Sequence, residues 1–449
     1  MIDLGDVREK LRENKIKRVK LAAVDMDGLL RGKWISVDKL DTIVESTTGF
    51  CDVVFGWDIG DVLYDNVKYT GWHTGYPDAT ARIDLQTFRQ IPWEPGTAFF
   101  LLDFQDRDGQ PLEVAPRQVF QRVLRRAEEM GYSPSFAAEY EFFLFRETAQ
   151  TLREKHFAQL ATLTPGMFGY SVLRASASSE LLVEMLTQLE AFDIPLEALH
   201  TETGPGVFEA AITADEGIRA ADRAALFKTA VKEIAGRHGL IPTFMAKWNA
   251  ELPGSSGHLH QSLWDILRNH NLFTATEANC VAPLMQQYMA GLVTYLPELT
   301  VCFCPTINSY KRTVPGVWAP VNATWGLDNR TTAIRAIPST GKSSRVELRA
   351  TGADINPYIA MAASLAAGLE GVDKKLELPP PVTNAYTEAA PALPRTLAEA
   401  TRRLRESEMA RRWLGESFVD HYAATRDWET RQFEKAVTDW ELARYLESI

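Results

Sequence analysis

Apolar residues dominate the stretch AAEYEFFLF at residues 137–145, and its length and aromatic content are typical of a buried β-strand. Two carboxylates, Glu139 and Glu141, lie one residue apart inside this run. Successive side chains of a strand point to opposite faces of a sheet, so both carboxylates are expected on the same face. An ionised carboxylate in apolar surroundings is costly unless something pairs with it. The pattern therefore predicts that either water or a cation covers this face.

Helical patterns flank this strand and also end the chain. Residues 3–16 show a short amphipathic pattern, and residues 116–130 place apolar side chains at helical spacing, with Pro116 near the start and Gly131 just past the end. The last fifty residues are charged, amphipathic and helical. Five aromatic residues are expected to anchor them by packing: Trp413, Phe418, Trp428, Phe433 and Trp440. The proline-rich stretch 376–395 is predicted to be an exposed loop.

The distribution of these elements predicts two domains. Short strand-like runs, interrupted by Gly, Asp and Pro, fill the chain up to about residue 105, and the polar, turn-rich segment DFQDRDGQPLEVAP follows. We expect a small N-terminal sheet domain over residues 15–108. A larger domain is expected over residues 112–449, with an antiparallel sheet and surrounding helices, so the predicted fold class is α+β.

Composition narrows the class of protein. The hydrophobic fraction of 45% and the charged fraction of 24% are those of a soluble globular chain. A net charge of −11 argues against nucleic-acid and anionic-membrane partners. No apolar run approaches the ~20 residues of a membrane span, and the charged N-terminus does not resemble a signal peptide. We expect a cytoplasmic protein with four reduced thiols: Cys51, Cys280, Cys302 and Cys304.

Other strand-like segments carry polar residues with the same period of two. GSSGHLHQSLWD places two histidines on one face, SSRVELRATG places a glutamate between two arginines, and LHTETGPGVFEAAI carries two glutamates around a Gly-Pro-Gly turn. If these strands are neighbours, one sheet face holds six candidate ligands: Glu139, Glu141, Glu202, Glu209, His258 and Glu347. Five carboxylates and one imidazole suit Mg²⁺ or Mn²⁺, and six ligands are enough for two ions.

Each of these patterns has a simpler interpretation when taken alone. A lone Glu-x-Glu strand is usually a solvated sheet face, a lone His-x-His is commonly a core or surface feature, and Arg-x-Glu-x-Arg is most often a cross-strand ladder of ion pairs. Phe143 and Phe145 continue the face of the two glutamates. Because a fully solvated face would not favour two aromatic rings, the combination favours a partly closed pocket.

Arginines accumulate beside the last of these strands. Five of them fall within 38 residues: Arg312, Arg330, Arg335, Arg345 and Arg349. Arginine is suited to bidentate contacts with phosphate and carboxylate groups. A metal site beside such a cluster indicates a polyanionic ligand that also requires metal, and ATP fits best. The chain contains neither a P-loop motif nor a G-x-G-x-x-G loop, which excludes those two kinds of nucleotide site.

Taken in order, seven blocks of the sequence resemble the signature blocks of the glutamine synthetase superfamily. They are EYEFFLF, HTETGPGVFE, TFMAKW, GSSGHLHQSLWD, NSYKRTVPGVWAP, NRTTAIR and RVELRATGADINPYIAMAASLAAGLEG. The resemblance covers roughly residues 15–375. It implies an N-terminal β-grasp domain and a C-terminal catalytic domain with a curved, antiparallel, metal-binding sheet. It also implies a homo-oligomer, a dodecamer of two hexameric rings, with active sites between subunits.

The resemblance also implies roles for individual residues. One metal, nearer the carboxylate substrate, would be held by Glu141, Glu202 and Glu209. A second metal, bridging the ATP phosphates, would be held by Glu139, His258 and Glu347. The substrate would be bound by Arg312, Arg349 and Gly254, and the phosphates by Arg330, Arg335 and Arg345. Positions near the nucleotide would be His260, Ser262 and Lys342. Catalytic roles would fall to Arg330, Glu209 and Trp318.

The sequence departs from the family pattern where ammonia-using members bind ammonium. Those members carry a glutamate just before Ala-Pro in the block after Val-Pro-Gly, and this chain has Trp318 there. Their Asp-Gly-Ser-Ser loop is absent from the comparable stretch VFGWDIGDVLYDN, although Asp58 or Asp61 could substitute in part. The family's Asn-Gly before the His-x-His block is Pro253-Gly254 here.

A tryptophan cannot bind ammonium through a charge-assisted hydrogen bond, but it can pack against an alkyl or aryl group or hold a cation over its face. Our hypothesis is therefore an ATP-dependent ligase that joins the γ-carboxylate of glutamate to an organic amine through γ-glutamyl phosphate. Trp318, with Trp57 or Trp248 as a neighbour, would line the amine pocket. Three alternatives stay open: a glutamine synthetase that uses ammonia, a ligase for another acid, and a catalytically silent structural or regulatory member.

Overall fold

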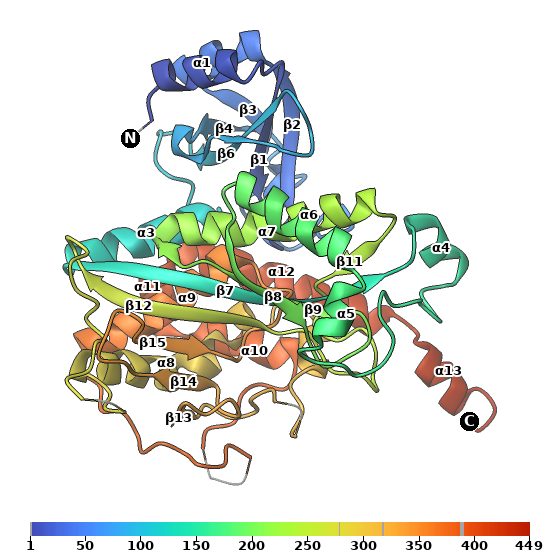
Figure 1. Cartoon of the computed structure of the whole chain (residues 1–449), viewed down its shortest axis with the longest axis vertical. Coiled ribbons are helices and arrows are strands. Elements are labelled where there is room, and N and C mark those ends of the chain that lie inside the picture. Colours follow the sequence, from blue (N-terminus) through green and yellow to red (C-terminus); the bar gives the residue numbers. More distant parts are fainter. Residues whose placement is uncertain (1, 278, 317, 387–389) are drawn as a thin grey trace.

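Two β-sheets, with helices between and beside them, make up the fold (Figure 1). The structure, a computed structural model, describes residues 2–277, 279–316, 318–386 and 390–449. Helices and strands are both abundant and the two sheets are built from different parts of the chain, so the predicted α+β class is confirmed. The domain boundary expected between residues 108 and 112 falls between the last strand of the first sheet and helix α3, and it stays a prediction.

The smaller sheet contains six strands in the order β2-β1-β6-β4-β3, with β5 beside β6. β1 and β2 form a hairpin, and β1 lies parallel to β6 at the centre, an arrangement consistent with the β-grasp prediction. Gly28 completes the hairpin turn with a φ of 82°, a conformation that glycine adopts without strain. The bounds are β1 Arg18–Val24, β2 Leu30–Ser36, β3 Thr48–Cys51, β4 Asp78–Ile83, β5 Arg89–Gln90 and β6 Thr97–Gln105, with helices α1 Leu4–Glu13 and α2 Leu40–Glu45.

The larger sheet contains nine strands and runs in the order β13-β14-β15-β12-β7-β9-β8, with β10 and β11 beside β7. All its pairings are antiparallel except the parallel pair of β13 and β14. The bounds are β7 Tyr132–Phe145, β8 Leu196–Thr201, β9 Val207–Ile212, β10 Asp215–Glu216, β11 Ile241–Thr243, β12 Gly257–Asp265, β13 Trp325–Leu327, β14 Ile334–Ile337 and β15 Arg345–Leu348.

Helices cover one face of the larger sheet. On β7 this face carries apolar residues: Tyr140 stacks on Phe227 of α7 with ring centroids 5.8 Å apart, and Phe136 meets Phe120 of α3 at 5.7 Å. The other face is left for the acidic residues. The helix bounds are α3 Pro116–Glu129, α4 Ala149–Glu154, α5 Val172–Ser176, α6 Ser179–Ala191, α7 Gly217–Arg237, α8 Pro283–Phe303, α9 Pro357–Asp373, α10 Leu397–Glu406, α11 Glu408–Leu414, α12 Glu416–Lys435 and α13 Asp439–Tyr445.

Buried ion pairs join the smaller-sheet region to helices α3, α7 and α12. Arg117 of α3 donates to Asp103 and Asp84 of the smaller-sheet region at 2.7 Å each, and to Asp222 of α7 at 2.9 Å. Arg426 of α12 donates to Asp27 in the β1–β2 turn at 2.6 Å. Removing one partner of such a buried network leaves an uncompensated charge, which is strongly destabilising. The position of the smaller sheet against these helices is therefore held by side chains far apart in the sequence.

Most of the expected elements are confirmed. The helices predicted at residues 3–16 and 116–130 correspond to α1 and α3, and the described residues of 376–395 contain no helix or strand. Trp413, Phe418 and Trp428 are buried, as expected for packing anchors. The same prediction is wrong for Phe433 and Trp440, which are 44% and 63% exposed. Their helical region, at the end of α12 and in α13, extends away from the rest of the chain at the lower right of Figure 1.

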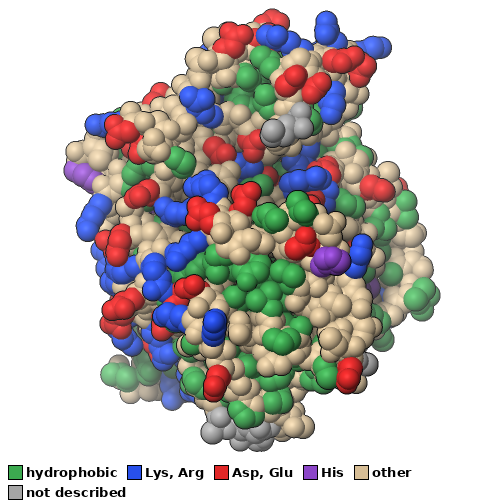
Figure 2. Space-filling view, turned by 90° about the vertical axis from the view of Figure 1, so that its left-hand side faces the viewer, with side chains coloured by type: hydrophobic (Ala, Val, Ile, Leu, Met, Phe, Trp, Pro, Cys, Tyr) green, Lys and Arg blue, Asp and Glu red, His purple; other side chains and the backbone are tan. Residues whose placement is uncertain are grey.

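The surface carries charges of both signs. On the face shown in Figure 2, acidic and basic side chains are interspersed around an apolar area, without a broad basic region. Across the part of the chain that the structure describes, no helix is both long and apolar enough to cross a membrane.

Candidate active site

The register of four neighbouring strands brings the predicted ligands to one face of the larger sheet. His258 of β12 lies directly opposite Glu139 of β7, and Glu209 of β9 lies directly opposite Glu141. Glu347 of β15 pairs with His260 of β12. Because the side chains alternate between faces with a period of two, these positions all face away from the helices that cover the sheet. The geometry produces two adjoining clusters of polar side chains.

The first cluster combines two carboxylates with two imidazoles. Nδ1 of His258 lies 3.7 Å from a carboxylate oxygen of Glu139 and 3.5 Å from one of Glu347, and Nε2 of His260 lies 3.1 Å from Glu139. Burial opposes ionisation of Glu347, but the neighbouring His258 and Arg349 lower its pKa to about 2. The pKa of Glu139 is also lowered, since the two nearby histidines outweigh the effect of burial. Both carboxylates are thus held in the ionised form.

The second cluster contains Glu141, Glu202 and Glu209, together with a residue that was not predicted from the sequence. Nε2 of His200 lies 3.3 Å from a carboxylate oxygen of Glu209, and this hydrogen bond raises the pKa of His200. The sequence did contain a pattern that could have identified His200: in the block HTE, His200 and Glu202 are two residues apart and therefore share a face. Burial and the charge of Glu209 raise the pKa of Glu141 to about 8. Two carboxyl groups thus meet across the β7–β9 pair, and the charge of Glu209 opposes ionisation of Glu141.

A divalent cation fits both clusters. Ligand atoms of Glu139, His260 and Glu347 lie within 4.8 Å of one another, as do those of His200, Glu202 and Glu209. Nε2 of His258 is buried and has no hydrogen-bond partner among the described residues. Carboxylate oxygens with a minority of imidazole nitrogens are the donor set that Mg²⁺ and Mn²⁺ accept. A cation would also relieve the repulsion between Glu141 and Glu209.

Four of the five predicted arginines border these clusters. Arg335 donates to Glu347 at 2.8 Å, and Arg349 forms an ion pair with the same carboxylate. Nε of Arg345 lies 3.1 Å from Nδ1 of His260. Arg349 also donates to the backbone carbonyl of Arg330 at 3.0 Å, which places the exposed Arg330 at the edge of the site. A cationic rim of this kind suits the phosphates of a nucleotide.

Arg312 is buried and closely packed, and its charge acts on Glu141 of the second cluster. It donates to the carbonyl of Ala350 at 2.9 Å and to Oγ of Ser256 at 3.3 Å. A Cβ atom on Gly254 would lie 2.6 Å from Cγ of Arg312 and 2.5 Å from the carbonyl of Ala246. Only glycine therefore allows Arg312 its observed position. The departure Pro253-Gly254 keeps the glycine on which this packing depends.

Of the two remaining predicted nucleotide contacts, one is on strand β12 and the other is in a connection between strands. Ser262 continues the His258 and His260 face of β12, opposite Ser135 of β7, and its Oγ accepts a hydrogen bond from the indole of Trp264 at 3.1 Å. Lys342 is exposed in the connection between β14 and β15, and its backbone carbonyl accepts from Asn271 at 2.8 Å.

Three tryptophans were expected near the amine, and they occupy different surroundings. Trp318 is 64% exposed and has a φ of 61° on the loop before β13. Burial raises the pKa of Tyr386. The backbone groups of Trp318 and Gly316 and the charge of Arg349 lie close enough to Tyr386 to oppose this increase in part. Trp318 is therefore near the Arg349 side of the site. Trp248 packs edge-on against Phe145 at 4.8 Å, and Trp57 lies under the guanidinium of Arg31 in the N-terminal part.

An additional aromatic ring borders the second cluster. Tyr170 stacks on His200 with ring centroids 4.4 Å apart, and its backbone N–H donates to the carbonyl of Thr201 at 2.7 Å. Burial and the charges of Glu202 and Glu209 raise the pKa of its hydroxyl. Tyr170 was not predicted, because an isolated tyrosine in a loop carries no pattern that separates it from other surface aromatics.

Comparison with known proteins agrees with this geometry. Residues 113–445 match the family model described as the glutamine synthetase catalytic domain. The chain is 47% identical over 450 residues to "Type-1 glutamine synthetase 2" of Dictyostelium discoideum, covering 99% of this chain and 86% of that protein. It is 39% identical over 448 residues to a glutamate–isopropylamine ligase of a Pseudomonas species, covering 99% and 98%. A solved structure described as a GmaS/ADP complex has a TM-score of 0.86 and 27% identity, covering 99% of this chain and 100% of that one.

Proposed function

Because the chain belongs to the glutamine synthetase family of ligases, we propose that it joins the γ-carboxylate of glutamate to an organic amine at the expense of ATP. The observation that carries the choice of amine is Trp318, an exposed indole at the position where ammonia-using members have a glutamate. An indole offers an apolar surface and a π-face to a substituted amine. A relative of 39% identity is named for a ligase that uses isopropylamine, which supports the same choice.

The chemistry requires that a poor acyl donor is activated. A carboxylate would have to expel oxide, so transfer of the ATP γ-phosphoryl group to the glutamate γ-carboxylate first creates an acyl phosphate, γ-glutamyl phosphate. The amine nitrogen then attacks the acyl carbon, phosphate leaves, and the nitrogen loses a proton. Arg312 and Arg349 would hold the glutamate carboxylate, while Arg330, Arg335 and Arg345 would contact the phosphates. Ser262, His260 and Lys342 would lie along the nucleotide.

Divalent metal ions, Mg²⁺ or Mn²⁺, would supply charge neutralisation during phosphoryl transfer. Glu141, Glu202 and Glu209 would hold one ion, with His200 in reach of the same site, and Glu139, His258 and Glu347 would hold the other. Since His260 shares the first cluster with Glu139 and Glu347, it orients these ligands or replaces His258 among them. The ionised state of Glu139 and Glu347 supports this assignment.

A second candidate function is synthesis of glutamine from ammonia. It is favoured by the name of the relative with 47% identity, a type-1 glutamine synthetase. In this case Glu202 or Glu209, or an acid of the N-terminal part such as Asp58 or Asp61, would have to replace the missing glutamate at position 318. A silent structural role has less support, because all six predicted metal ligands are present in the two clusters of one sheet face.

We propose in addition that the protein is a homo-oligomer, a dodecamer of two hexameric rings with active sites between subunits. This assembly is the one that the family resemblance implies. It is supported by α13, whose side chains are not buried against the rest of the chain although several are large and apolar.

The proposed reaction is tested by phosphate release from the purified protein with ATP, Mg²⁺ and glutamate. Ammonia, ethanolamine, putrescine, isopropylamine and aniline are compared as acceptors. We expect turnover with at least one organic amine to exceed turnover with ammonia by about tenfold or more in kcat/KM, which corresponds to about 1.4 kcal/mol of transition-state binding. A preference for ammonia would instead establish the second candidate function.

The role of Trp318 is tested by Trp318→Ala. Loss of the indole surface is expected to reduce the ratio of kcat/KM for the organic amine to that for ammonia by about tenfold. The matched control is Trp72→Ala, which removes another exposed tryptophan, 83% accessible, from the N-terminal part. An unchanged ratio in Trp318→Ala would overturn the pocket assignment while leaving the ligase activity itself intact.

A further inference from the structure

His200 lies at one end of a row of side chains that crosses three strands of the larger sheet. The residue directly opposite His200 in the β8–β9 pair is Glu209, and the residue opposite Glu209 in the β7–β9 pair is Glu141. Opposed residues of antiparallel strands have Cβ atoms about 5 Å apart, so these side chains share a face and neighbour one another. Glu202 follows directly after the last residue of β8. The register therefore places one imidazole among three carboxyl groups.

The three carboxyl groups, Glu141, Glu202 and Glu209, have few partners of their own. Among the residues that the structure describes, none of them forms an ion pair with a lysine or an arginine. Backbone N–H groups donate to Glu141 and to Glu202, at 2.7 Å in each case. Glu209 has Nε2 of His200 as its polar neighbour, at 3.3 Å. The cluster thus contains more negative charge than the surrounding side chains balance.

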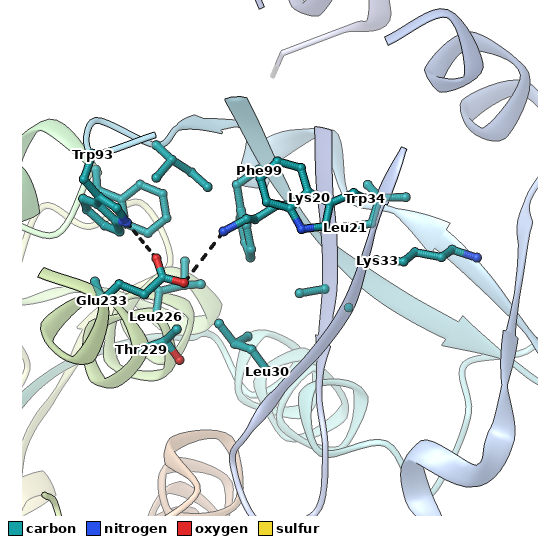
Figure 3. Close-up of a pocket in the computed structure, with 15 residues that line it drawn as sticks. Lys20, Leu21, Leu30, Lys33, Trp34, Trp93, Phe99, Leu226, Thr229 and Glu233 are labelled. Atoms are coloured by element: carbon teal, nitrogen blue, oxygen red, sulfur yellow. Dashed lines mark hydrogen bonds and ion pairs between the residues drawn. The ribbon is translucent and has the colours of Figure 1, made fainter. Parts of the chain in front are cut away.

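A carboxylate whose charge is balanced by protein groups has different surroundings. In the cavity between the smaller sheet and α7, Glu233 lies between Lys20 and Trp93 (Figure 3). The ammonium of Lys20 is 3.7 Å from one carboxylate oxygen, and the indole N–H of Trp93 donates to the other at 2.7 Å. That carboxylate therefore needs no further cation. Glu202 and Glu209 have no such cationic side chain among the described lysines and arginines, so a bound metal ion can supply the positive charge.

The hydrogen bonding of His200 leaves its Nε2 atom for a cation. Nδ1 lies 3.3 Å from the backbone carbonyl of Thr201, and because a carbonyl can only accept, Nδ1 carries a proton in this contact. Nε2 faces Glu209, where it can hold either a proton or a metal ion. Metal-ligating histidines characteristically donate their other ring N–H to a carbonyl or carboxylate, which fixes the tautomer and the ring orientation. His200 therefore has the tautomer that coordination through Nε2 requires.

The imidazole ring is also held in place by its neighbours. Tyr170 stacks on it with ring centroids 4.4 Å apart and an interplanar angle of 25°. The carbonyl of Thr201, which accepts from Nδ1, also accepts from the backbone N–H of Tyr170 at 2.7 Å. In this arrangement, ligand atoms of His200, Glu202 and Glu209 lie within 4.8 Å of one another. The imidazole nitrogen is thus positioned beside two carboxylates before any ion binds.

We propose that Nε2 of His200 coordinates the ion of the second cluster, alongside Glu202 and Glu209. This ligand role rests on the proposed function, since it takes the second cluster as a metal site, and it adds a nitrogen donor to that site. Mg²⁺ is bound mainly through oxygen, whereas affinity for nitrogen donors rises along the first-row transition ions from Mn²⁺ onwards. One imidazole among the carboxylates therefore makes the site prefer a transition ion such as Mn²⁺ to Mg²⁺.

The test compares binding of Mn²⁺ and of Mg²⁺ to the full-length protein by isothermal titration calorimetry, without ATP, glutamate or amine. His200→Gln is expected to weaken Mn²⁺ binding at one site about tenfold or more, and Mg²⁺ binding less than about threefold. His200→Glu offers an oxygen instead, so it should bind Mg²⁺ at least as tightly as the wild type but lose the preference for Mn²⁺. The matched control is His238→Gln, because Nε2 of His238 also faces a carboxylate, that of Glu184 at 2.8 Å, but outside the two clusters. Circular dichroism establishes that each variant is folded.

A spectroscopic measurement distinguishes coordination from a structural role of His200. Electron spin echo envelope modulation of bound Mn²⁺ detects coordinated nitrogen directly. The nitrogen modulation should decrease in His200→Gln without vanishing, since the first cluster keeps its own histidines, and it should be unchanged in His238→Gln. Unchanged Mn²⁺ affinity or unchanged nitrogen modulation in His200→Gln, or a Mn²⁺ preference retained by His200→Glu, would overturn the ligand role and leave the ligase proposal intact. Absence of Mn²⁺ binding by the wild-type protein would overturn the metal assignment of the proposed function as well.

Discussion

Glu141 faces Glu209 across the β7–β9 pair, and this contact makes a bound cation testable at the scale of one residue. In the metal-free protein the pKa of Glu141 is raised to about 8, so the folded state retains a proton that the unfolded state loses. Glu141 therefore does not lower the free energy of unfolding below pH ~4.5, but it lowers that free energy progressively as the pH rises from there towards 8. Glu141→Gln removes this cost. In chelator at pH 8, its melting temperature is expected to equal or exceed that of the wild type.

Addition of Mg²⁺ should reverse this order. A cation whose free concentration is a hundred times its Kd stabilises the folded state by about 2.7 kcal/mol. Glu141→Gln should lose at least half of the resulting shift in melting temperature. Differential scanning calorimetry with and without Mg²⁺ measures both effects, and Glu128→Gln is the control. An undiminished Mg²⁺ shift in Glu141→Gln would remove this residue from the ligand set.

Gly254 provides a second prediction, which separates glutamate binding from amine binding. The Cβ of Gly254→Ala would overlap Arg312 and the carbonyl of Ala246, so the arginine must move. If Arg312 holds the glutamate carboxylate, the KM for glutamate should rise about tenfold or more while the KM for the amine changes less than about threefold. Gly236→Ala is the control, because its Cβ would meet no atom within 4 Å. Equal changes in both KM values would indicate general disturbance of the site.

Individual residues differ in how far the sequence could identify them. Glu139, Glu141 and His258 stand out because polar residues with a period of two are unusual in an otherwise apolar strand. His200 meets the same criterion, since it lies two residues before Glu202, so periodicity could have added it to the candidate ligands. The surroundings of Trp318 could not be predicted, since its loop lies close to Tyr386 and Arg349 from distant segments.

At the scale of elements, α12 provides a pH-dependent contact with the N-terminal part. His421 is buried, donates from Nε2 to the carbonyl of Phe55 at 2.9 Å, and packs edge-on against Tyr69. Burial lowers the pKa of His421 to about 4, below the ordinary 6.5, so the folded state resists protonation. Its contribution to stability is present above pH 6.5 and is lost as pH falls towards 4.

The expected loss from His421 is about 2 kcal/mol between pH ~7.5 and pH ~5, since one pKa unit corresponds to about 1.36 kcal/mol. Urea denaturation of the wild type and His421→Gln at both pH values measures it. The variant should be less stable at the higher pH, but the decrease in its free energy of unfolding towards the lower pH should be smaller by about that amount. Parallel decreases in both proteins would show that other groups determine the acid sensitivity.

Element types were largely predictable because the period of apolar positions differs between helices and strands. α3 and β7 follow directly from their patterns. The pairing of β7 between β12 and β9 could not be read from periodicity alone, because nothing in a strand's own sequence names its neighbours. The ordered family blocks implied a metal-binding sheet, and the register then brought Glu139 opposite His258 and Glu141 opposite Glu209.

At the scale of the whole molecule, the α+β class was predictable, but the placement of the two sheets was not. The packing of the smaller sheet against the helices depends on pairs such as Arg426 with Asp27, which are separated by 399 residues, and on Arg117, which bonds to both Asp103 of β6 and Asp222 of α7. No local pattern marks such partners. The same limit applies to surfaces: Phe433 and Trp440 have the spacing of buried anchors, yet they are exposed in the single chain.

The exposed C-terminal helix leads to a prediction about assembly. α13 contributes no buried residue to its own chain, and its region exposes Val437, Trp440, Leu442, Tyr445 and Leu446. An apolar cluster of this kind on a projecting helix favours a contact with a second copy of the chain. Deletion of residues 436–449 should therefore leave each chain folded but reduce the mass of the assembly, as measured by analytical ultracentrifugation.

Two further measurements make the assembly prediction decisive. Far-ultraviolet circular dichroism of the truncated chain should show the loss of one short helix and no more, since the deleted residues contact little of the core. Glu447→Gln, a polar change within the same segment, should assemble like the wild type. If the truncated and full-length proteins sediment with the same number of subunits, α13 does not join copies of the chain. If the full-length protein is a monomer, the proposed dodecamer is wrong, and a site completed by a neighbouring subunit is wrong with it.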